Sequence, residues 1–164
     1  MAGEPRPQRD RDAAGRPRNA RPRDSLGRPL ARTGRDMLRA ADDEAALPPQ
    51  DTLALADALI AEGRPFHAHE VLEALWHVAP PDERKFWQGL AQIAVGLTHA
   101  QRGNPVGAVA LLRRGADRVA RHLGDDHGVD ISRIVEQCGS LADRIEKDGL
   151  DGVQPADLVL LLRG

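Results

Sequence analysis

A histidine and a glutamate four residues apart are the first residues in this sequence whose types and spacing could do chemistry. In a helix, His69 and Glu73 lie one turn apart on the same face. On a helical wheel, Phe66 and Trp76 fall within about 80° of this pair. An exposed polar face rarely carries an aromatic residue at each end, so we expect the pair to be at least partly buried.

A second polar row belongs to the segment that follows. Residues 86–100 carry no charged side chain, although 29% of the chain is charged, which favours a helix in the middle of a bundle. Gln88, Gln92 and His99 lie on one face of this helix, and Arg102 extends the row.

Folding these two helices back on each other at Pro80-Pro81 predicts which of their residues meet. We expect Gln88 near Glu73 and Gln92 near His69, with His99 about two turns beyond His69.

Two interpretations of this cluster remain open. The first is a structural network, because a buried polar group without a partner costs about 1–3 kcal/mol. The second is a site for one divalent metal ion, because an imidazole and a carboxylate one turn apart can share an ion. The predicted ligands are His69, Glu73 and His99. The residues predicted to surround them are Gln88, Gln92, Trp76 and Arg102.

The elements that must position these residues are all helices. We predict them from three signals, which are capping residues, helix-breaking glycines and prolines, and apolar residues spaced 3–4 apart. They run over about 51–62, 65–78, 82–102, 104–123 and from 130 through 145, with a short one from 155. Short connections predict a compact antiparallel bundle of about five to six helices, and Cys138 lies on an apolar stripe typical of the core.

Charge and composition divide the chain into an Arg/Pro-rich N-terminal extension, 1–50, and a helical-bundle domain, 51–164. We expect the extension to be disordered or loosely docked, because it buries too little apolar surface to offset its chain entropy. It lacks aromatic residues among its arginines, so nucleic acid is an unlikely partner. No run is long enough to span a membrane and no signal peptide is evident, which favours a cytoplasmic protein.

The two polar rows also resemble a known family. His69, Glu73 and Trp76 form the pattern His-x-x-x-Glu-x-x-Trp, and Gln88–Gln92 leads to His99–Asn104 and then Gly107-Ala108. Over roughly residues 50–123 the chain is similar to domain-of-unknown-function family 309 (DUF 309). Residues 19–30 resemble the N-terminal extension of actinobacterial members of that family.

The resemblance implies an all-α fold and a metal site, with a label of predicted metal-dependent hydrolase that names no substrate. It leaves two functions to compare. One is a divalent-metal-binding hydrolase centred on His69 and Glu73. The alternative is a non-catalytic protein-interaction module with a purely structural polar network. The sequence leaves open whether the chain is an enzyme, what its partner is and whether it forms a homo-oligomer.

Overall fold

The computed structural model describes residues 46–164, and the fold of this part is all-α, as predicted. Its elements are α2 (Pro49–Ala61), α3 (Pro65–Val78), α4 (Arg84–Gln101), α5 (Pro105–Ala120), α6 (Ile131–Asp148) and the 3₁₀ turn η1 (Pro155–Leu158). These described residues contain no strand; one isolated antiparallel bridge joins Val129 and Arg163. The predicted extension lies almost entirely outside the described residues, and so does the family-like stretch 19–30.

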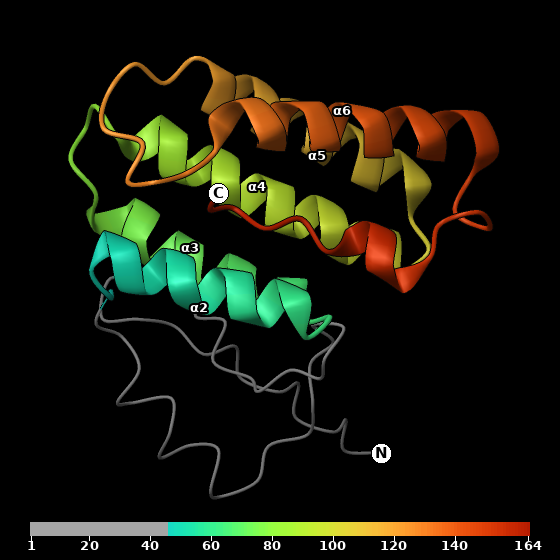
Figure 1. Cartoon of the computed structure of the whole chain (residues 1–164), viewed down its shortest axis with the longest axis horizontal. Helices are drawn as coiled ribbons and strands as arrows, with labels where there is room; N and C mark the ends of the chain where they lie inside the picture. Colours follow the sequence, from blue (N-terminus) through green and yellow to red (C-terminus); the bar gives the residue numbers. More distant parts are fainter. Residues whose placement is uncertain (1–45) are drawn as a thin grey trace, which may run out of the picture.

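The helices form two layers around α4 (Figure 1). α4 packs against α3 on one side and against α5 on the other, while α2 packs on α3 and α6 packs on α5. The C-terminal segment after η1 runs between the α2–α3 layer and the α5–α6 layer. Across the described part, no helix has the length and apolarity needed to cross a bilayer.

α3 and η1 begin at the prolines that the sequence predicted, and α5 and α6 begin directly after the predicted capping residues. Proline occupies the first turn of α5, and the side chain of Asn104 accepts a hydrogen bond from the Gly107 N–H at 3.0 Å. At the start of α6, the side chain of Asp130 accepts a hydrogen bond from the Arg133 N–H at 3.1 Å. Each side chain satisfies a donor that the helix itself leaves unpaired.

Two other predicted capping residues were wrong. The cap of α2 is Pro48 and not Asp51, because the carbonyl of Pro48 already accepts the Thr52 N–H at 2.9 Å. The cap of α4 is Glu83 and not Asp82, because the residues after Pro80 first form a turn that bonds back to the Pro80 carbonyl.

The core centres on α4 and includes side chains from every α-helix. Both aromatic residues of α4 are almost completely buried, Phe86 at 1% and Trp87 at 0% exposure. The other large side chains with less than 2% exposure are Leu53, Ile60, Leu72, Leu90, Ile93, Leu97, Leu112, Ile134, Ile145 and Leu162. The polar residues of interest must therefore lie at the edges of this apolar core.

A buried carboxylate fixes the C-terminal segment to the bundle. Asp57 of α2 is only 7% exposed, and its two oxygens accept hydrogen bonds from the Leu162 N–H at 2.6 Å and the Arg163 Nε–H at 3.0 Å. The carbonyl of Leu162 in turn accepts the Asp130 N–H at 3.1 Å. The segment therefore links α2 to the start of α6.

Glycines bring the backbones of α4 and α5 into direct contact. A Cβ atom at Gly115 would lie 2.7 Å from the carbonyl oxygen of Gly89 and 2.7 Å from Cγ1 of Ile93. One turn further, a Cβ atom at Gly96 would lie 3.0 Å from Cγ of Leu112. No larger residue fits at Gly115 unless the two helices move apart.

We expect Gly115→Ala to lower the free energy of unfolding by roughly 1–3 kcal/mol, because the added methyl group overpacks the contact. The matched control is Gly139→Ala in α6, where a Cβ atom meets nothing within 4 Å. That change should raise stability by roughly 0.5–1 kcal/mol through helix propensity alone. Urea unfolding followed by circular dichroism compares the two, and a stabilised Gly115→Ala protein would contradict the close contact.

Candidate functional site

The structure places His69 and Glu73 side by side on α3. His69 Nε2 lies 3.3 Å from Glu73 Oε2, and the side chains are 19% and 39% exposed. The pair is thus partly buried, as its aromatic flanks indicated. The other carboxylate oxygen of Glu73 lies 3.6 Å from Nε2 of His77, whose side chain is 64% exposed. Glu73 therefore lies between two imidazoles on one helix.

Aromatic rings hold both ends of this row. The edge of Phe66 contacts the His69 ring, with centroids 5.8 Å apart and planes at 66°. Trp76 packs against the core and stacks on His77, with centroids 4.9 Å apart and planes at 17°. The guanidinium carbon of Arg102 lies 5.5 Å from the centroid of Phe66, so a positive charge lies near the His69 end.

Two polar side chains of α4, Gln88 and His99, lie within hydrogen-bond distance of α5 and its capping residue. The side-chain oxygen of Gln88 accepts a hydrogen bond from Arg118 Nη1 at 2.8 Å, instead of meeting Glu73 as the folding-back argument predicted. The reason is the close helix contact, because a Cβ atom at the adjacent Gly89 would lie 3.0 Å from Cβ of Arg118. His99 Nδ1 lies 2.9 Å from Nδ2 of Asn104, the residue that caps α5.

Gln92 is the remaining member of this row. It is partly exposed, and its buried side-chain oxygen has no hydrogen-bond partner within residues 46–164. The structure therefore shows no hydrogen bond from Gln92 to His69.

The donor set around His69 and Glu73 is small. Within the described part of the chain, no three His, Cys, Asp or Glu side chains are grouped so that they could hold a metal ion. His99 therefore does not join His69 and Glu73 in a three-ligand group, and its ring nitrogen faces Asn104.

A second polar cluster, which the sequence did not predict, lies around His127. Its side chain is only 14% exposed, and its Nε2 lies 3.1 Å from Glu83 Oε2. The same oxygen accepts the indole N–H of Trp87 at 3.0 Å, and His127 Nδ1 lies 3.6 Å from Asp125 Oδ2. The spacing of Glu83 and Trp87, one turn apart, was the available signal.

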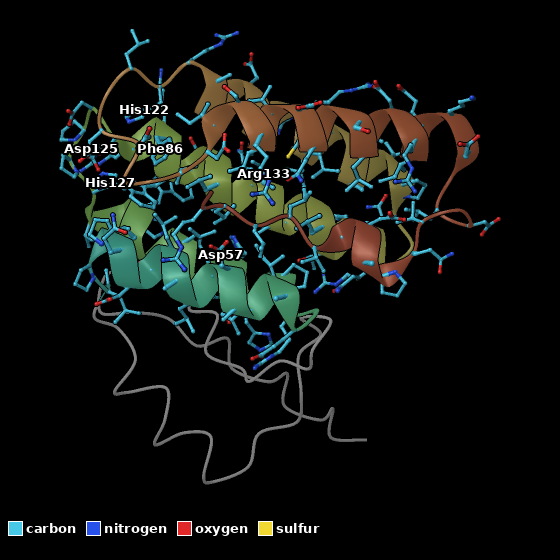
Figure 2. The ribbon with its side chains drawn as sticks, viewed as in Figure 1. Asp57, Phe86, His122, Asp125, His127 and Arg133 are labelled. Atoms are coloured by element: carbon cyan, nitrogen blue, oxygen red, sulfur yellow. The ribbon has the colours of Figure 1, made fainter. Side chains whose placement is uncertain are left out.

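This cluster fixes the α5–α6 loop on the start of α4. His122 stacks on Phe86 with centroids 4.3 Å apart, and its Nε2 lies 3.0 Å from the carbonyl oxygen of Asp125. Figure 2 shows Phe86, His122, Asp125 and His127 gathered at this end of α4. The side chain of Gln50 also donates to the His127 carbonyl at 2.8 Å. The contacts explain why a loop histidine is largely covered.

The fold and the site define a class: a helical bundle with a His/Glu pair on the helix that precedes its central one. The model of the family described as "Domain of unknown function (DUF309)" matches residues 53–111, which include α3, α4 and the pair. The resemblance stated from the sequence is therefore confirmed over residues 53–111.

A curated relative supports the same assignment. The chain is 38% identical over 88 residues to "Uncharacterized protein YpuF" of Bacillus subtilis (strain 168). The match covers 49% of this chain and 48% of the relative, so the chain spans about half of that relative's length. No solved structure matches the chain.

Cys138 is fully buried in α6, and burial raises the pKa of its thiol to about 12 from an ordinary value of 9.0. Folding therefore favours the neutral thiol. The resulting stabilisation is complete below the unfolded pKa and is lost as the pH rises from about 9 toward 12.

We expect the free energy of unfolding to fall more steeply above pH 9 in the wild-type protein than in Cys138→Ala, by up to about 1.4 kcal/mol per pH unit. Urea unfolding at several pH values between 8 and 11 measures both slopes. Parallel curves would show that the thiol does not titrate differently in the folded and unfolded states.

Proposed function

We propose that this protein binds one divalent metal ion through His69 and Glu73 and acts as a metal-dependent hydrolase. The observation that carries the proposal is the 3.3 Å separation between His69 Nε2 and Glu73 Oε2, one helical turn apart and partly buried. The family match over residues 53–111 includes both residues.

The donor atoms fit a divalent ion that keeps several coordinated waters. An imidazole nitrogen and a carboxylate oxygen are ordinary ligands of zinc, manganese, iron and nickel. The described residues supply two such donors at this position, which leaves coordination positions open, as hydrolytic sites require. When bound, a divalent ion lowers the pKa of a coordinated water.

The surrounding side chains orient the two donors. Trp76 holds His77 by stacking, and His77 faces the oxygen of Glu73 that does not meet His69. The edge of Phe66 restricts the His69 ring at the other end. Such outer contacts fix the direction of ligand atoms and typically change metal affinity 10–100-fold.

A non-catalytic interaction module is the second candidate function. It is favoured by the lack of a three-ligand group within the described residues and by the bonding of Gln88 and His99 toward α5. In this alternative, His69 and Glu73 only stabilise α3, and the bundle surface holds a partner.

We expect untagged protein purified without chelator to carry close to one equivalent of metal, and His69→Ala to lose it. The matched control is His77→Ala, which removes an imidazole from the same carboxylate and the same helix face. It should retain metal, although with weaker affinity. Elemental analysis gives the stoichiometry, and far-UV circular dichroism shows whether helix content is unchanged.

A wild-type protein that binds none of zinc, manganese, nickel or iron would contradict the metal proposal. His69→Ala would then chiefly lower stability, since Glu73 loses its nearest partner, and the interaction module would be favoured. Complete metal loss in both variants would instead extend the ligand set to His77.

A further inference from the structure

Three arginines lie in α5 and a fourth is its C-cap residue: Arg113, Arg114, Arg118 and Arg121. They differ in the groups that neutralise their charge. Arg113 donates to Asp143 at 2.8 Å and to Glu146 at 2.7 Å, both on α6. Arg121 pairs with Asp117 one turn earlier, at 3.1 Å. These two cations are therefore neutralised by carboxylates of the bundle.

Arg118 is partly buried beside α4 and bonds to a neutral group. Its Nη1 donates to the amide oxygen of Gln88 at 2.8 Å. Its Nε is buried and has no hydrogen-bond partner within the described residues. The start of its side chain lies against the α4 backbone, because a Cβ atom at Gly89 would come within 3.0 Å of Cβ of Arg118. The described carboxylates form no ion pair with it.

Arg114 lies one turn before Arg118 on the same side of α5. It is exposed, and no hydrogen-bond or ion-pair partner is found for it in the described part of the chain. Two like charges four residues apart destabilise a helix slightly. A partly buried cation without a counter-ion adds a further desolvation cost.

We propose that Arg114 and Arg118 bind the phosphate group of a small anionic ligand, with Gln88 orienting the Arg118 guanidinium. A phosphate group would remove the repulsion between the two cations and accept hydrogen bonds from the exposed Arg114 guanidinium. Its charge of nearly −2 matches two arginines, whereas a carboxylate matches one. The planar guanidinium donates two parallel hydrogen bonds to such an anion.

The ligand is a small phosphate compound and not a nucleic acid. α5 contains no aromatic residue on which a base could stack, and Arg113 and the C-cap residue Arg121 are already paired with carboxylates. The site involves α4 and α5, so it does not depend on a metal ion at His69 and Glu73.

The test is titration of the full-length protein with inorganic phosphate at constant ionic strength, followed by the NMR signals of the arginine Nε–H groups. We expect a saturable shift of the Arg118 signal with phosphate and none with acetate. Arg114→Gln and Arg118→Gln should each weaken phosphate binding at least tenfold. His69→Ala should bind phosphate as the wild type does, which separates this site from the metal proposal.

Arg121→Gln is the matched control, because it removes the same charge from the C-cap residue of α5, which is already paired with Asp117. Its phosphate affinity should stay within twofold of wild type. Arg114 is exposed, so Arg114→Gln decides the question even if Arg118→Gln disturbs the fold. The proposal is overturned by an Arg118 signal that does not move, by an equal response to acetate, or by equal weakening in Arg121→Gln.

Discussion

The direct contact between the backbones of α4 and α5 is the constraint on which most of this structure depends. Gly89 and Gly115 let the two helices approach so closely that a methyl group added at either glycine would force them apart. This approach presses Arg118 against α4 and turns the side chain of Gln88 toward α5. The same packing leaves α3 to carry the His69–Glu73 pair at the edge of the bundle.

The polar side chains are thus divided between α3 and the contact of α4 with α5, and the two groups differ in their chemistry. The α3 row contains imidazoles and a carboxylate held by aromatic rings, which is a donor set for a cation. Between α4 and α5 lies the Arg118 guanidinium, bonded to the Gln88 amide, which belongs to the proposed phosphate site. α4 lies between the two, so this largely apolar helix separates the proposed metal site from the proposed phosphate site.

The helices and two of their capping residues could be predicted from the sequence, since Asn104 and Asp130 act on residues only three positions away. The contacts between side chains of different helices could not be predicted from the sequence. A helical wheel placed Gln88 and His99 on one face correctly, but it carries no information on which neighbouring helix that face meets. The burial of His127 was missed for the same reason, because its partner Glu83 lies 44 residues earlier in the chain.

The carboxylate of Asp57 gives the bundle an uneven folding order. Most helices pack on a neighbour in the sequence, which requires only short loops to close. The hydrogen bond from Leu162 to Asp57 instead closes a loop of 105 residues, and the entropy of that closure must be lost before the bond can form. We therefore expect the C-terminal segment to join the bundle after the neighbouring helices have packed.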